Sequence, residues 1–259
     1  MFFKRLALTI AYVTSIPVGV DFGREEMSSL EGLGKYLPLV GLLIGLLITG
    51  LALSLATIRA DGLLAATLVT LVWLAITGSL HMDGLMDTAD GVFSHQSKEK
   101  MLEIMQDSRV GNFGVLTGVA AVLIKLTSIN ALVHSQGSLI PALLLIPASA
   151  RWTELYAIAC MPYARENGKG KVWHDSTKLP DDLVRGALPV AITAAILISA
   201  YSLPVVLILL STTIFSGILS AHRLNSIVGG QTGDTYGAVV ELSEAGGLMF
   251  SALILNYLF

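Results

Sequence analysis

The chain has 259 residues, of which 54% are hydrophobic and 14% charged, and its mean hydropathy is +0.73. Soluble domains carry about 25% charged residues, so this composition excludes a water-soluble globule and indicates an integral membrane protein. The net charge of −3 does not indicate a nucleic-acid-binding protein, and the single cysteine excludes a disulfide framework or a cysteine-rich zinc site.

The N-terminal apolar segment, Leu6–Val20, contains Pro17 and is shorter than the ~20 residues that a transmembrane helix needs. It is expected to lie in the interface, to re-enter, or to span with help, and the sequence leaves these alternatives open. A polar loop, Asp21–Lys35, follows.

Long apolar stretches then predict an all-α fold, a polytopic membrane bundle of about seven transmembrane helices that forms one membrane-embedded domain over residues 1–259. The predicted spans are Tyr36–Thr57, Gly62–Leu80, Phe113–His134, Ser138–Cys160, Gly186–Tyr201, Leu203–Ala221 and Gly237–Phe259. Only a short turn separates the fifth from the sixth, so they could also form one tilted hairpin.

The distribution of basic residues supports this layout. Thirteen of the sixteen Lys and Arg residues fall in the loops of one predicted side, Arg59 falls on the other, and Lys125 and Arg151 fall inside spans. By the positive-inside rule, the basic side is cytoplasmic. The sequence therefore predicts a multi-pass membrane protein, in contact with membrane lipid, whose basic loops face the cytoplasm.

An acidic segment follows the second predicted span. Asp83, Asp87 and Asp90 are spaced by four and three residues, which places all three carboxylates on one face if the segment is helical. Like charges so close repel each other, so the arrangement favours a bound cation between them. Mg²⁺ prefers carboxylate oxygens together with substrate phosphates, and the segment is therefore a candidate metal site.

A second acidic segment, GGQTGDTYGAVVELSE over Gly229–Glu244, falls on the same predicted side of the membrane. Asp234 and Glu241 are seven residues apart, which again indicates one helical face. We expect the two acidic segments to share one site.

Other side chains are candidates for contact with an anionic substrate. Asp107 and Arg109 precede Gly111 and Gly114 in DSRVGNFG, a loop whose arginine and backbone N–H groups could hold a phosphate. His81, at the membrane boundary, is a candidate general base or a group that supports a metal ligand, with an interfacial histidine of no catalytic role as the alternative.

Three ionisable residues fall inside predicted spans. Arg151 and Glu154 are three residues apart and can pair with each other, and Lys125 lies in the preceding span. Because burying such groups in a bilayer is costly, they indicate either a functional site or a structural ion pair.

The loop Tyr163–Lys178 places Arg165, Lys169 and Lys171 among glycines. This composition suits an anionic substrate, and it also suits contact with anionic lipid head groups.

The motifs HMDGLMDTADGVF, EIMQDSRVGNFGV, PYARENGKG and GGQTGDTYGAVVELSE, in this order, resemble those of the cobalamin synthase (adenosylcobinamide-GDP ribazoletransferase) family. The resemblance extends over nearly the whole chain. It implies an enzyme of the cell inner membrane, with its active site facing the cytoplasm, that catalyses the last step of nucleotide-loop assembly in cobalamin biosynthesis. A hydroxyl of α-ribazole or its 5′-phosphate attacks the phosphate on the cobinamide arm of adenosylcobinamide-GDP. GMP leaves, and adenosylcobalamin or its 5′-phosphate forms.

The resemblance also implies Mg²⁺ as the cofactor, and the residues supply the candidate roles. The candidate metal ligands are Asp83, Asp87, Asp90, Asp234 and Glu241. The candidate catalytic residues are Asp83, Asp87, Asp90 and His81, one of which would accept the hydroxyl proton. The candidate substrate-binding residues are Asp107, Arg109, Arg151, Arg165 and Lys171.

Three other classes of membrane protein are weighed against this interpretation. A CDP-alcohol phosphotransferase would carry Ala-Arg shortly after an Asp-Gly, whereas Asp83-Gly84 is followed by Leu-Met-Asp-Thr. A membrane prenyltransferase would carry two similar aspartate motifs, which the stretch around Asp234 does not match. A secondary transporter would concentrate charge near the midplane and often contain an internal repeat. No repeat is evident here, and oligomeric state, including a homo-oligomer, stays open.

Overall fold

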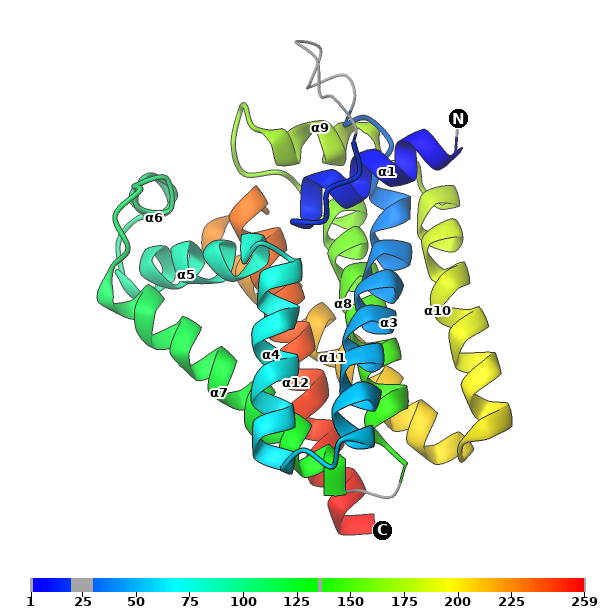
Figure 1. The fold of residues 1–259 in the computed structure, drawn as a ribbon. Helices are drawn as coiled ribbons and strands as arrows, with labels where there is room; N and C mark the ends of the chain where they lie inside the picture. Colours follow the sequence, from blue (N-terminus) through cyan, green and yellow to red (C-terminus); the bar gives the residue numbers. More distant parts are fainter. Residues whose placement is uncertain (1, 20–29, 135–136, 259) are drawn as a thin grey trace.

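The computed structural model describes residues 2–19, 30–134 and 137–258, and it is helical throughout this part of the chain apart from loops (Figure 1). The described residues form no β-strand, only an isolated bridge between Tyr163 and Gln231. The helices are α1 Phe2–Val13, η1 Gly34–Tyr36, α3 Leu37–Thr57, α4 Gly62–Ile76, α5 Leu80–Phe93, α6 Lys98–Ile104, α7 Asn112–His134, α8 Leu139–Cys160, α9 Lys169–Ser176, α10 Asp181–Ala200, α11 Leu203–Val228 and α12 Gly233–Leu258. The predicted all-α membrane bundle is confirmed.

Five helical stretches are long and apolar enough to cross a bilayer, and a sixth arises if the bent pair α4–α5 counts as one span. They include both α10 and α11, so the predicted fifth and sixth spans are two separate helices. The predicted number of about seven is not confirmed. The 22-residue α8 is not among these stretches. It carries the charged residues Arg151 and Glu154, and most of its residues are buried in the bundle.

The second predicted span ends earlier than expected. The chain bends by 88° between α4 and α5, at Gly78 and Ser79, which both adopt the left-handed conformation with φ of 57° and 55°. Glycine adopts this conformation without strain, so the bend begins where the sequence permits it. As a result α5, which carries the three aspartates, lies across one end of the bundle (Figure 1).

The described part of the N-terminal apolar segment also lies across the end of the bundle. α1 has 12 residues, too few to cross a bilayer, and it lies across the same end of the bundle as α9 (Figure 1). It buries Leu8 and Val13 and leaves Phe3 82% exposed. An interfacial position is therefore the alternative that the structure supports, while most of the predicted loop Asp21–Lys35 falls outside the described residues.

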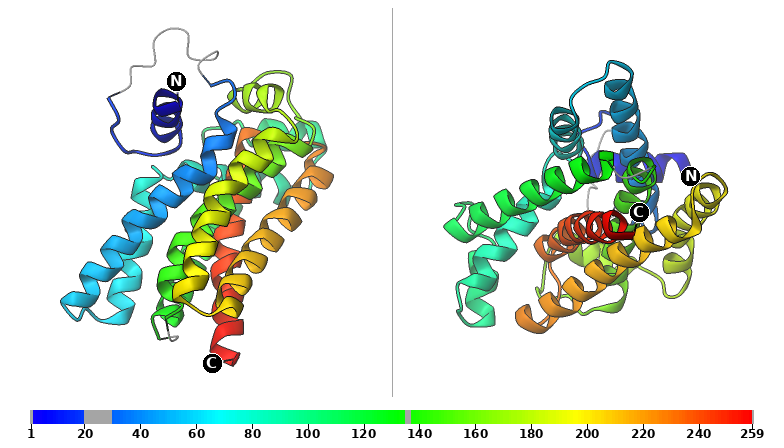
Figure 2. Two further views of the ribbon diagram at one scale, coloured as in Figure 1. Left: turned by 90° about the vertical axis from the view of Figure 1, so that its right-hand side faces the viewer. Right: turned by 90° about the horizontal axis from the view of Figure 1, so that it is seen from below.

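Helix α12 is the central element of the bundle. Seen from below, it lies between α7 and α11 (Figure 2), and it also packs against α5 and α8. The helices α5, α6 and α9 gather at one end of the bundle, whereas the C-terminus lies at the other (Figure 1). The end that collects α5 and α9 is the end to which the sequence assigns most of the basic residues.

Candidate functional site

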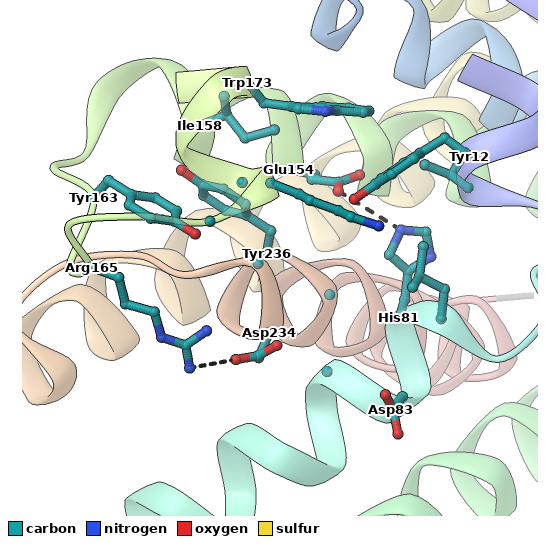
Figure 3. A pocket seen from close by; sticks show the side chains of 18 residues that line it. Tyr12, His81, Asp83, Glu154, Ile158, Tyr163, Arg165, Trp173, Asp234 and Tyr236 are labelled. Carbon is teal, nitrogen blue, oxygen red and sulfur yellow. Dashed lines mark hydrogen bonds and ion pairs between the residues drawn. The ribbon is translucent and has the colours of Figure 1, made fainter. Parts of the chain in front are cut away.

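A cavity of about 260 Å³ opens at the end of the bundle where α1, α5, α8, α9 and α12 meet (Figure 3). Its polar and aromatic lining comes from Tyr12, His81, Asp83, Glu154, Tyr163, Arg165, Lys169, Trp173, Asp234 and Tyr236. Of the residues that the sequence put forward as catalytic, substrate-binding or metal-binding, the cavity brings together His81, Asp83, Arg165 and Asp234.

Two glycines allow the acidic segments to meet. A Cβ atom on Gly84 of α5 would lie 2.7 Å from the backbone oxygen of Asp234, and one on Gly237 of α12 would lie 3.0 Å from the backbone oxygen of His81. No other residue type permits so close an approach of the two helices. The crossing places Asp83 and Asp234 on one cavity, so the expected meeting of the two acidic segments is confirmed.

The carboxylates at this crossing have little positive charge around them. Arg165 Nη2 donates to Asp234 Oδ2 at 2.8 Å, whereas Asp83 and Asp87 have no such ion pair with the residues that the structure describes. Burial, followed by repulsion from Asp83, Asp234 and Asp90, raises the pKa of Asp87 to about 7. Three neighbouring carboxylates thus share one guanidinium, and this imbalance favours an additional cation.

The same carboxylates fit a magnesium ion that is only partly held by protein. Within the described ranges, no three His, Cys, Asp or Glu side chains converge closely enough to hold an ion by themselves. Mg²⁺ usually binds through one or two carboxylates together with water and substrate phosphates. Asp83, Asp87 and Asp234 are the residues that could supply these carboxylates.

Asp90 has a different position from the other two aspartates of α5. Its carboxylate accepts hydrogen bonds from the backbone N–H groups of Gly111 at 2.7 Å and Gly114 at 2.8 Å. A carboxylate at a helix N-terminus is stabilising, so Asp90 connects α5 to the start of α7. The sequence suggested that backbone N–H groups of this loop bind a phosphate. In the structure, the N–H groups of Gly111 and Gly114 donate their hydrogen bonds to Asp90 instead.

The residues just before α7 lie away from the cavity. Arg109 pairs with Asp107 at 2.6 Å, and its side chain is 87% exposed. The hydrogen bonds from Arg109 lower the pKa of Asp107 to about 2. Neither residue lines the cavity, so this pair is a feature of the surface loop.

Two lysines in the first turn of α9 have different surroundings. Lys169 lines the cavity, whereas Lys171 pairs with Asp175 on the exposed side of α9 at 3.0 Å. The two residues are only two positions apart, but residues at this spacing face different sides of a helix. Lys169, rather than Lys171, is thus the lysine that faces the site.

A second charged cluster lies inside the bundle. Lys125 Nζ lies 2.6 Å from both Glu241 and Glu244, and Arg151 Nη1 donates to Glu244 at 2.7 Å. All four side chains are at most 2% exposed. We call these four residues the buried quartet, and Lys125 also lies 5.0 Å from the ring centre of Trp73.

The buried quartet explains why two candidate residues do not reach the cavity. Glu241 follows Asp234 by two turns of α12, which places it about 10 Å deeper along the helix axis, beside Lys125. Arg151 does not pair with Glu154, as the sequence suggested, because Glu244 of α12 offers it a carboxylate. Glu154 lies 3.7 Å from His81 Nε2 instead.

Sequence reasoning did not assign the aromatic wall of the cavity to the site. The ring centres of Tyr12 and Trp173 lie 5.4 Å apart, and those of Tyr163 and Tyr236 lie 6.2 Å apart. Burial and the nearby Glu154 raise the pKa of Tyr12 to about 12. These rings come from four separate segments of the chain, so no spacing in the sequence predicts that they line one cavity.

Comparisons with known proteins agree with one another. The family model described as cobalamin-5-phosphate synthase matches residues 5–252. The chain is 34% identical to the adenosylcobinamide-GDP ribazoletransferase of Alkaliphilus oremlandii, covering 98% of each chain. It is 36% identical to that of a Synechococcus strain, covering 84% of this chain and 85% of the relative, and 35% identical to that of Desulfitobacterium hafniense, covering 93% of each. No solved structure matches.

Proposed function

Because the chain belongs to the cobalamin-5-phosphate synthase family, we propose that it is an adenosylcobinamide-GDP ribazoletransferase of the membrane. It joins adenosylcobinamide-GDP to α-ribazole or α-ribazole 5′-phosphate. The products are GMP and either adenosylcobalamin or its 5′-phosphate. The reaction is the final step in the assembly of the nucleotide loop.

The observation that carries this proposal is the meeting of Asp83, Asp234 and Arg165 on one cavity at the polar end of a membrane bundle. In the reaction, the ribazole hydroxyl oxygen forms a bond to the phosphorus on the cobinamide arm. The bond from this phosphorus to the oxygen of GMP breaks, and the hydroxyl proton passes to a base. Catalysis of such a transfer depends on positioning and on neutralising the phosphate charge.

Two basic side chains at the cavity are placed to contact the phosphates. Arg165 is held by Asp234 at 2.8 Å, which orients its guanidinium, and its remaining N–H groups stay available for phosphate oxygens. Lys169 adds a second cation to the lining of the cavity. The other basic candidates form ion pairs outside the cavity: Arg109 with Asp107, Arg151 with Glu244 and Lys171 with Asp175. We therefore assign phosphate contact to Arg165 and Lys169.

The general base is assigned to His81. Its side chain is buried, lines the cavity two residues before Asp83, and lies 3.7 Å from Glu154. Within the described residues, neither ring nitrogen of His81 has a hydrogen-bond partner, and one of them is therefore available to accept the hydroxyl proton.

Magnesium dependence is part of the proposal. One or two of the carboxylates of Asp83, Asp87 and Asp234 would hold the ion together with substrate phosphate, and a bound Mg²⁺ would neutralise charge on the diphosphate of the substrate. The neighbouring carboxylates, which add to the effect of burial in raising the pKa of Asp87, support this assignment. We leave Asp90 out of the proposed set because its two oxygens already accept hydrogen bonds from backbone N–H groups at the start of α7.

We place the enzyme in the cell inner membrane with the cavity facing the cytoplasm. The positive-inside rule supports this orientation, since α5, α9 and most of the basic loops lie at the cavity end. The membrane-embedded helices anchor the site, and the two substrates reach it from the cytoplasmic side.

A release assay for GMP tests the proposal. Purified protein in lipid nanodiscs is incubated with adenosylcobinamide-GDP, Mg²⁺ and either α-ribazole or its 5′-phosphate, and GMP is measured by chromatography. GMP is expected only when both substrates are present, and EDTA is expected to abolish its release. The absence of turnover with both ribazole forms would disprove the assignment, and turnover unaffected by EDTA would disprove the magnesium role.

A further inference from the structure

A second cavity lies on the outer surface of the bundle, away from the site described above. This groove of about 570 Å³ runs between α3 and α10, both of which are long and apolar enough to cross a bilayer. Its walls include Leu39 and Leu42 from α3 and Leu188, Ile192 and Ile196 from α10. The three α10 residues are spaced by four, so they follow one helical face.

These apolar walls are open to the surroundings. Leu188, Ile192 and Ile196 are 52%, 59% and 63% exposed. At bilayer depth, an open groove between two spanning helices is filled by hydrocarbon and not by water. Its shape and lining suit an acyl chain that lies along the helices.

The groove ends in basic side chains at the end of the bundle that carries the active-site cavity. Lys35 and Arg185 belong both to the groove and to a neighbouring polar pocket of about 430 Å³. An apolar groove and a polar pocket that share two cationic residues form one amphipathic site. Such a site matches a molecule with a chain at one end and a charged group at the other.

The charged residues of the polar pocket indicate whether the charged end of the bound molecule is anionic or cationic. Lys35 pairs with Asp182 at 3.0 Å, and Asp175 pairs with Lys171 outside the pocket. Among the described residues, the pocket side chains left without an ion pair are Arg5, Lys178, Arg185, Glu31 and Asp181. The described lining as a whole holds four basic and four acidic residues, so the excess of one positive charge arises because Lys171, outside the pocket, neutralises Asp175.

We propose that this site binds an anionic glycerophospholipid. One acyl chain occupies the groove between α3 and α10, and the phosphate contacts Arg185 at the junction. Arginine suits this role because its guanidinium can offer two N–H groups to one phosphate. The site is separate from the active-site cavity, so the proposal does not depend on the enzymatic assignment.

Native mass spectrometry of the full chain, released from nanodiscs of defined composition, tests the proposal. The wild type is expected to retain dioleoyl-phosphatidylglycerol in preference to dioleoyl-phosphatidylcholine, which carries the same chains and phosphate but no net charge. Arg185→Gln is expected to reduce the retained phosphatidylglycerol roughly fivefold, since one basic residue contributes about that factor to anionic lipid binding. Ile192→Trp, which fills the groove from an exposed position, is expected to reduce it as well.

Arg223→Gln is the matched control, because Arg223 of α11 is also exposed and lies outside the groove. Its lipid retention is expected to equal that of the wild type. Equal retention of the two lipids by the wild type would overturn the anionic preference. Unchanged phosphatidylglycerol retention in both Arg185→Gln and Ile192→Trp would overturn the site itself.

Discussion

Helix α12 carries acidic residues in two regions whose surroundings differ. At its start, Asp234 faces Asp83 and Asp87 of α5, and Arg165 is the one basic side chain that pairs with this group within the described residues. Two turns deeper, Glu241 and Glu244 face Lys125 and Arg151, so the buried quartet is electrically balanced. The first region lies at an open cavity, and the second has no access to solvent.

The difference in charge balance separates a binding region from a structural one. A buried ion pair that satisfies both partners holds helices in register, and removing one partner leaves an uncompensated charge. An accessible group of carboxylates that exceeds its cations is instead suited to a cationic ligand. The same residue type on one helix thus serves two purposes, and substitutions should distinguish them.

The largest effect is expected at the unbalanced region. Asp83→Ala should lower the rate of GMP release by roughly 10³-fold, because charge stabilisation by a bound metal contributes several kcal/mol. The protein should still insert and unfold at an unchanged temperature, since Asp83 is exposed. Steady-state kinetics and thermal unfolding in nanodiscs measure both. Asp107→Ala, which removes an acid outside the cavity, serves as the control, and a near-normal rate in Asp83→Ala would refute the metal assignment.

A comparable loss, but of stability, is expected from the buried quartet. Lys125→Met should lower the free energy of unfolding by about 3–5 kcal/mol, because two buried carboxylates lose their shared cation. The double variant Lys125→Met/Glu241→Gln keeps the charge balanced and should recover part of this loss. Denaturant unfolding in detergent compares the two variants. If the double variant were no more stable than Lys125→Met, the loss of charge balance would not be the cause of the destabilisation.

A smaller effect on rate is expected at the assigned base. His81→Gln should lower kcat by about 10²-fold, the lower limit for loss of a general base, with little change in KM for adenosylcobinamide-GDP. Steady-state kinetics of GMP release measure both constants, and glutamine cannot accept the hydroxyl proton. A kcat equal to that of the wild type would assign the proton transfer to another group.

The smallest effect is expected at Asp90, which separates it from Asp83 although both belong to one acidic segment. Asp90→Ala should lower the free energy of unfolding by about 1–2 kcal/mol, the usual contribution of a side chain that caps a helix. GMP release should fall far less than in Asp83→Ala when both are assayed below the unfolding temperature. Equal losses of activity in the two variants would return Asp90 to the metal site.

Composition and local pattern determined the fold class, the helical segments and the polar end of the bundle. Apolar stretches long enough to cross a bilayer and the one-sided distribution of lysine and arginine need no tertiary information, because each is read along a single segment. For the same reason, the sequence placed Asp83 and Asp234 at one membrane face.

Only the tertiary structure decided which charged residues share an environment. Three candidate residues pair with another helix instead of reaching the cavity. Asp90 accepts from the start of α7, Glu241 pairs with Lys125, and Arg151 pairs with Glu244. Their residue type and spacing in the sequence do not show this. Two further features likewise arise only where separate segments pack: the groove between α3 and α10, and the aromatic wall of Tyr12, Tyr163, Trp173 and Tyr236. Such contacts depend on where helices cross and how closely their glycines let them approach, and a linear pattern does not contain that information.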